Sequence, residues 1–104
     1  MFVVVNELFV ADADREVFER NFGASMRGTL SAVPGLVGAR LMRAREVGRG
    51  YVSMLEFADE AAYIGYLQSD AFRAAHDWPD HAPIESNVLS TYSVITDVVE
   101  NVRP

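Results

Sequence analysis

The stretch that most constrains this chain is residues 2–10, which read Phe-Val-Val-Val-Asn-Glu-Leu-Phe-Val. β-Branched and aromatic residues dominate it and predict a strand. Side chains alternate along a strand, so one face receives Phe2, Val4, Asn6, Leu8 and Val10, and the other receives Val3, Val5, Glu7 and Phe9. Both faces are largely apolar, which indicates that both are covered. Helices of this chain can cover one face, and a second copy of the chain would then cover the other.

The next part of the chain predicts a helix and a hairpin. An acidic N-cap within residues 11–14 precedes a helix that continues to about Val33, because apolar residues recur there at i+3 and i+4. A Pro-Gly pair ends this helix. Strands at 36–45 and 51–57 are expected on either side of a glycine-rich turn at 47–50.

The last part predicts two short helices and a final strand. Asp59 caps the first of these helices, and Ser69 opens the second, which runs through His76. Residues 77–83 contain two prolines and are expected to form a loop. A long strand from Val88 to Val99 and a short tail then complete the chain.

This element order, β-α-β-β-α-β, is the ferredoxin-like pattern: a four-stranded antiparallel sheet with the helices on one face. The sheet face without helices needs a cover. The apolar residues Tyr92, Val94 and Val98 near the end of the chain favour a second copy as that cover, and so a homodimer. We expect one domain over residues 1–104, with a tail from about residue 100.

Composition excludes several classes of function. A net charge of −6 argues against a protein that binds nucleic acid or an anionic membrane surface. No run of about 18 apolar residues predicts a membrane span, and no secretory signal is visible. The absence of cysteine fits a reducing cytoplasm. Motifs for nucleotide cofactors, serine hydrolysis and zinc proteolysis are missing.

His76 and Asn6 are the first candidates for chemistry. A neutral imidazole is a common metal ligand and the usual proximal ligand of haem iron. Small residues before His76, at 71, 74 and 75, would let a flat ring approach. Alternatively, His76 only ends a helix, where its charged form favours the helix dipole. Asn6 is an amide on an apolar strand face, so it either pairs internally or points into a pocket.

Aromatic and cationic residues supply the remaining candidates. Tyr66, Tyr63 and Phe72 lie at helical spacing and either fill the core or form the wall of a pocket. Arg27 flanks the apolar stripe of the first long helix, where it could pair with a carboxylate or extend into water. His81 lies in the proline-containing loop and is expected to be solvated.

On these residues the chain resembles the antibiotic biosynthesis monooxygenase domain, a dimeric α+β barrel. The general resemblance rests on Pro-Gly-Leu-Val-Gly at 34–38, on the hairpin, and on Asp-Glu-Ala-Ala-Tyr at 59–63. Within that family, Asn6 and Ser-Asp-Ala-Phe-Arg-Ala-Ala-His at 69–76 resemble the IsdG-type haem-degrading monooxygenases. That branch usually has tryptophan ten residues before the histidine, where this chain has Tyr66.

The resemblance implies roles for these residues. His76 would be the proximal ligand of haem iron, Asn6 an amide near bound dioxygen, and Arg27 a pocket arginine. Tyr66 would replace the tryptophan that presses on the haem. Haem would be both cofactor and substrate, dioxygen would oxidise its ring, and an external electron donor would be needed.

Two other functions remain open at this point. The first is a cofactor-independent monooxygenase of a phenolic or quinol-type aromatic, in which Asn6, Tyr66 and Tyr63 hold an activated substrate anion. The second is a non-catalytic module that binds haem or another small molecule.

Overall fold

The computed structural model describes residues 1–76 and 83–98, with the side chains of Ala75 and His76 outside the description. Its elements follow the predicted order: β1 (Phe2–Phe9), a 3-10 turn η1 (Asp12–Asp14), α1 (Arg15–Leu30), β2 (Leu36–Met42), β3 (Tyr51–Phe57), α2 (Glu60–Leu67), α3 (Asp70–His76) and β4 (Ser86–Ser93).

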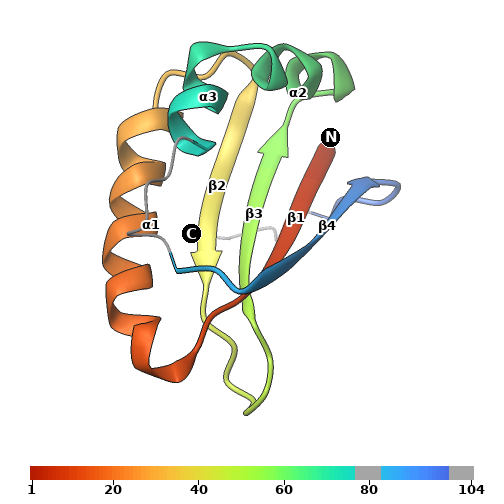
Figure 1. The fold of residues 1–104 in the computed structure, drawn as a ribbon. Coiled ribbons are helices and arrows are strands. Elements are labelled where there is room, and N and C mark those ends of the chain that lie inside the picture. Colours follow the sequence, from red (N-terminus) through yellow and green to blue (C-terminus); the bar gives the residue numbers. More distant parts are fainter. Residues whose placement is uncertain (77–82, 99–104) are drawn as a thin grey trace, which may run out of the picture.

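The strands form one four-stranded sheet in the order β2-β3-β1-β4, and every neighbouring pair is antiparallel. The predicted ferredoxin-like fold is therefore confirmed. α1 lies beside β2 and packs against α3, while α2 and α3 lie at one end of the sheet (Figure 1). β1 is a central strand, so its side chains occupy the middle of both sheet faces.

The core consists of two clusters between the helices and the sheet. The members of the first are Val4, Leu30, Phe57 and Tyr66, and those of the second are Leu8, Phe18, Phe22 and Tyr51. Met26 of α1 packs against both clusters. Val4 and Leu8 thus show that the even-numbered face of the first strand points towards the helices.

Two predicted helix caps are confirmed. The backbone N–H of Ala62 donates to Asp59 Oδ1 at 2.8 Å, which fixes the start of α2. The backbone N–H of Phe72 donates to Ser69 Oγ at 3.1 Å, directly before α3. By fixing the starts of α2 and α3, these caps position the residues of both helices that belong to the candidate site.

The main difference from expectation is the last strand, which was predicted over Val88–Val99. β4 runs from Ser86 to Ser93 because it can pair only along the length of β1, from Phe9 opposite Ser86 to Phe2 opposite Ser93. Residues 94–98 extend past the end of β1 and are not a strand, and residue 99 lies outside the described residues. α1 and β2 likewise end three residues earlier than predicted, at Leu30 and Met42.

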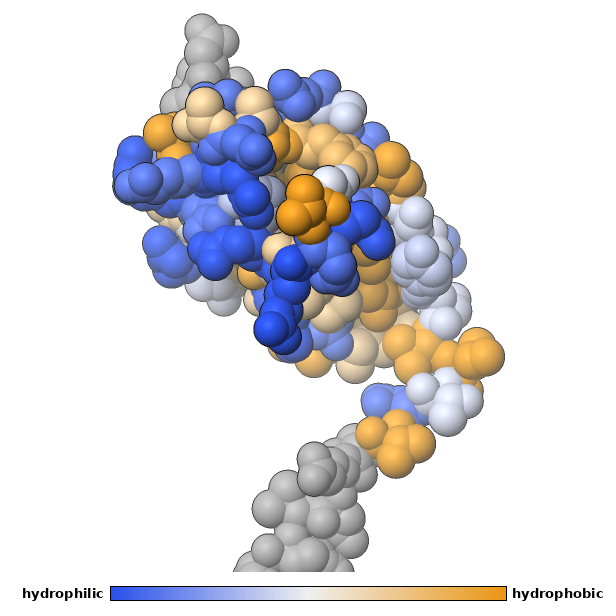
Figure 2. Space-filling view, turned by 90° about the horizontal axis from the view of Figure 1, so that it is seen from below, coloured by the Kyte–Doolittle hydropathy of each residue, from blue (hydrophilic) through white to orange (hydrophobic). Residues whose placement is uncertain are grey.

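The sheet face away from the helices, together with the segment after β4, exposes apolar side chains. Tyr92 of β4 is 55% exposed, and Ile95 and Val98 are 93% and 85% exposed. Figure 2 shows hydrophobic side chains on the segment that leads away from the body of the molecule.

Within the described residues, no helix is long and apolar enough to cross a membrane.

Gly35 joins α1 to β2, and its conformation predicts that a substitution there would strongly destabilise the fold. Its φ is +79°, and a Cβ there would lie 2.5 Å from Ala62 Cβ at the start of α2. We expect Gly35→Ala to destabilise the fold by roughly 3 kcal/mol in urea unfolding, from backbone strain and overpacking. Gly48→Ala is the matched control, because Gly48 has a φ of +86° and no atom within 4 Å, and should cost only about 1 kcal/mol. Equal losses would show that the Ala62 contact is unimportant.

Candidate functional site

A polar level, formed by Asn6 and Ser53, separates the two apolar core clusters on the sheet. Asn6 lies between Val4 and Leu8 on the helix-facing side of β1, and it pairs directly with Ser53 of β3. Ser53 is buried, with 8% of its surface exposed. Two adjacent strands therefore place an amide and a hydroxyl side by side where an uninterrupted apolar core would otherwise continue.

Asn87 of β4 fixes the orientation of the Asn6 amide. Asn87 pairs with Leu8 and so shares the face of Asn6. Its Nδ2 donates to Asn6 Oδ1 at 3.0 Å. With its oxygen engaged, Asn6 presents its NH₂ group as a donor. That group has no hydrogen-bond partner among the residues that the structure describes.

Tyr66 belongs to the apolar cluster on the Val4 side of this polar level. It is 5% exposed, and its ring lies 5.7 Å from that of Phe57 and 5.4 Å, edge to face, from that of Phe72. Tyr63 stacks on Phe2 at 5.2 Å at the outer end of the same group. Burial, with a smaller effect from Tyr63, raises the pKa of the Tyr66 phenol above its ordinary value. Tyr66 is therefore a neutral hydroxyl at physiological pH.

The hydroxyl groups of Tyr66 and Ser53 open into accessible space. Neither has a hydrogen-bond partner in the described part of the chain. At the same time, none of the fully buried polar side-chain atoms described there lacks a partner. These two hydroxyls therefore keep access to solvent or to a ligand. With the Asn6 NH₂ group, they are donors that could bind an oxygen atom of a ligand held between the helices and the sheet.

His76 is the last residue of α3, one turn after Phe72. α3 packs against both α1 and α2, so the backbone of His76 belongs to the helical layer above the sheet. Its side chain lies outside the description. Trp78 and His81 also lie outside the described residues. No group of metal-ligating side chains occurs within residues 1–76 and 83–98.

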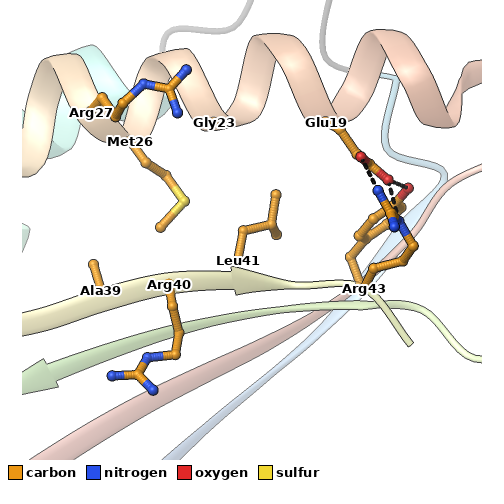
Figure 3. Close-up of a pocket in the computed structure, with 9 residues that line it drawn as sticks. Glu19, Gly23, Met26, Arg27, Ala39, Arg40, Leu41 and Arg43 are labelled. Atoms are coloured by element: carbon orange, nitrogen blue, oxygen red, sulfur yellow. Dashed lines mark hydrogen bonds and ion pairs between the residues drawn. The ribbon is translucent and has the colours of Figure 1, made fainter. Parts of the chain in front are cut away.

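Arg27 lines a cleft whose described lining contains no other predicted site residue. A cleft of about 520 Å³ lies between α1 and β2, and its lining includes neither Asn6 nor any of the predicted aromatic residues. Its lining residues are Glu19, Gly23, Met26, Arg27, Ala39, Arg40, Leu41, Arg43 and Tyr51 (Figure 3).

A hydrogen-bond network closes one end of this cleft. Arg43 donates to both oxygens of Glu19, at 2.7 and 2.5 Å, and the Tyr51 hydroxyl donates to Glu19 Oε2 at 2.6 Å. Arg15 Nε donates to the Tyr51 oxygen at 3.2 Å. The bonds from Arg43 and then Tyr51 lower the pKa of Glu19 to about 2.

Sequence reasoning missed Ser53 and Asn87. A serine within the apolar strand Tyr-Val-Ser-Met-Leu was a usable signal for Ser53. Asn87 had no such signal, because the predicted last strand began at Val88, one residue too late.

Residues 1–78 match the family model described as antibiotic biosynthesis monooxygenase. The chain belongs to this family. Its monooxygenase domain is thus established, and the reaction that this member catalyses is a separate question. No curated protein matches the chain in sequence.

Solved structures share this fold at low sequence identity. MhuD from Mycobacterium tuberculosis, a haem degrader with two haems in its active site, is similar with a TM-score of 0.81 and 18% identity, over 95% of this chain and 100% of that chain. A MhuD variant with two manganese protoporphyrin IX molecules per active site gives 0.83 and 19%, over 96% and 100%. SnoaB from Streptomyces nogalater, described as a cofactor-independent oxygenase, gives 0.74 and 20%, over 95% and 97%. Solved structures of a haem degrader and of a cofactor-independent oxygenase thus share this fold.

The Glu19 network predicts a pH dependence of stability. A carboxylate whose pKa is lower in the folded state stabilises the fold above its unfolded pKa, and this contribution is lost as the pH falls through the folded value. At pH 7 we expect the wild type to have a higher melting temperature than Glu19→Gln. This difference in melting temperature should narrow below about pH 4.5 and disappear near pH 2. Thermal unfolding followed by circular dichroism measures this gap. Glu46→Gln, at an exposed carboxylate in the hairpin turn, is the control and should show no comparable gap.

Proposed function

We propose that this protein is a haem-binding monooxygenase that opens the haem ring with dioxygen and an external electron donor. The observation that carries the proposal is the polar level at Asn6 and Ser53, set between two apolar clusters beneath the helical layer. A flat apolar ligand with a reactive centre needs this combination of apolar walls and one directed donor.

The proposal gives each predicted residue a separate task. His76, at the end of α3, would supply the proximal ligand to iron. The Asn6 NH₂ group, oriented by Asn87, would donate a hydrogen bond to an oxygen atom of the bound molecule. Tyr66 and Phe72 would form the aromatic wall, with Tyr63 at its outer end.

The described side chains fit such a ligand. The clusters around Val4 and Leu8 offer apolar surface on either side of the donors. The small side chains of Ala71 and Ala74 would let a flat ring approach α3 closely. Haem, when bound, would supply the iron that activates dioxygen and the ring carbon that is oxidised. This chain would hold the ring, keep bulk water away and donate one hydrogen bond.

A cofactor-independent oxygenase is the second candidate, and one observation favours it. The donors from Asn6, Ser53 and the neutral Tyr66 hydroxyl could bind a phenolate oxygen without any metal. In that case purified protein without hemin would consume dioxygen when given a naphthol-type phenol, in the presence of a chelator.

Hemin titration tests the leading proposal. We expect the wild type to give a sharp Soret band at micromolar hemin, and His76→Ala to weaken or remove it because the axial ligand is lost. The chain has two histidines, so His81→Ala is a matched control that should keep the band. With a reductant, air and catalase, the band of the wild type should bleach.

The outcomes separate the candidate functions. No Soret band at micromolar hemin would exclude both the haem enzyme and a haem-binding module. A band that stays stable under reductant and air would indicate a binder that does not degrade haem. A band that is equally sensitive to both histidine substitutions would remove the ligand role from His76.

We also propose that the functional unit is a homodimer formed through the sheet face without helices. Val3 and Val5 of β1, Val52 and Met54 of β3 and Tyr92 of β4 share that face by strand register. Tyr92 and, after the strand, Ile95 are exposed apolar side chains, and exposed apolar patches often mark protein interfaces.

Light scattering tests the dimer. The wild type should have twice the chain mass of 11.5 kDa. Tyr92→Arg should shift the mass towards the monomer, because it places a charge in the proposed interface. Thr91→Arg, on the opposite face of the same strand by register, is the control and should leave the mass unchanged. A wild-type monomer would contradict the proposal.

A further inference from the structure

The row of side chains that crosses the sheet at Asn6 has two polar residues between two leucines. Ser53 of β3 pairs with Asn6 on one side, and Leu89 of β4 pairs with Asn6 on the other. Leu41 of β2 pairs with Ser53 and points towards α1 (Figure 3). Directly paired residues share a face of the sheet. The hydroxyl and the amide therefore lie next to each other on the helix-facing side, with an apolar side chain beyond each.

The hydrogen bond from Asn87 directs the NH₂ group of Asn6 towards Ser53. Asn87 belongs to β4 and Ser53 to β3, so they lie on opposite sides of Asn6. Asn87 Nδ2 donates to Asn6 Oδ1 at 3.0 Å, which holds the amide oxygen on the β4 side. The oxygen and the NH₂ group of a carboxamide diverge from one carbon atom. The NH₂ group is therefore on the side of β3, where the Ser53 hydroxyl lies.

The two donors meet without satisfying each other. Neither the Asn6 NH₂ group nor the Ser53 hydroxyl has a hydrogen-bond partner in the described part of the chain, although Ser53 is only 8% exposed. Paired side chains have Cβ atoms about 5 Å apart, so both groups can reach one atom of a ligand. Within the two fully described strands β1 and β3, no helix-facing residue is a carboxylate that would compete for these donors.

We propose that Ser53 is a second ligand-binding residue, and that Asn6 and Ser53 together bind one anionic oxygen of the ligand in preference to a neutral one. The inference rests on the site of the proposed function, without requiring that the ligand be haem. Two preorganised donors on one oxygen stabilise negative charge. Asn87 holds the Asn6 amide in a fixed direction, whereas a serine hydroxyl rotates freely and can follow the oxygen.

Two probes with one skeleton test this preference in protein without hemin. 4-Nitrophenolate carries an anionic oxygen, and 4-nitroanisole has a methyl ether in its place. Calorimetric titration at mildly alkaline pH, where the phenol is ionised, should give tighter binding of the phenolate by the wild type. Ser53→Ala should weaken the phenolate about ten-fold, as expected for one hydrogen bond to a charged group, and should leave 4-nitroanisole unchanged. Asn6→Leu should act in the same direction.

A matched pair of substitutions separates the hydroxyl from the shape of the side chain. Ser53→Thr keeps the hydroxyl and should keep the phenolate preference, whereas Ser53→Val has the same shape without it and should lose that preference. Ser90→Ala is the control, because Ser90 pairs with Val5 and so lies on the opposite face of the sheet. A wild type without the preference, Thr and Val variants that behave alike, or a Ser53→Ala variant that weakens both probes equally would each overturn the role of Ser53.

Hemin distinguishes this proposal from the haem proposal. Hemin should displace 4-nitrophenolate, because haem would occupy the space between the same two apolar clusters. If no Soret band appears, the haem proposal fails, and the two probes still decide the role of Ser53. If hemin-saturated protein binds 4-nitrophenolate as tightly as free protein does, the anion lies elsewhere and the assignment to Asn6 and Ser53 is wrong.

Discussion

The pairing of β1 with β3 on one side and β4 on the other is the constraint on which the rest of this structure depends. Because the side chains of a strand alternate, pairing on both edges fixes which residues of β1 face the helices. Val4 and Leu8 then anchor the two core clusters, and Asn6 must lie between them. A slip by one residue would bury Glu7 and expose both anchors, so the packing energy of the core also holds the amide in place.

This constraint explains how much could be predicted from the sequence. Period-two alternation placed Asn6 on the same face as Val4 and Leu8, and local cap chemistry located the starts of α2 and α3 at Asp59 and Ser69. The role of Asn87 was beyond prediction, because it depends on the register between strands at opposite ends of the chain. The same reason explains the wrong end of the last strand, since the length of β1 limits β4.

For Arg27, sequence reasoning gave a position on one helix, and its role as a pocket arginine stays a prediction. Helical spacing placed it beside the apolar stripe of α1, and a pocket arginine was a reasonable expectation. Spacing along one helix does not say which strand the side chain meets, and here the neighbouring strand is β2. Because Gly23 has no side chain, the guanidinium of Arg27 can lie close to the helix backbone at that position. A haem degrader and a cofactor-independent oxygenase share this fold, so the fold alone does not specify the reaction.

The contact at Gly35 bears on the position of α2, which carries part of the candidate site. This glycine has a hydrogen atom where any other residue would press on Ala62, and its carbonyl accepts the N–H of Ala58 at 2.8 Å. The beginning of α2 is thereby pinned to the connection between α1 and β2. We therefore expect α2 to be held in place more firmly than the rest of the helical layer. This contact therefore sets where α2 lies relative to the sheet, and α2 carries Tyr63 and Tyr66.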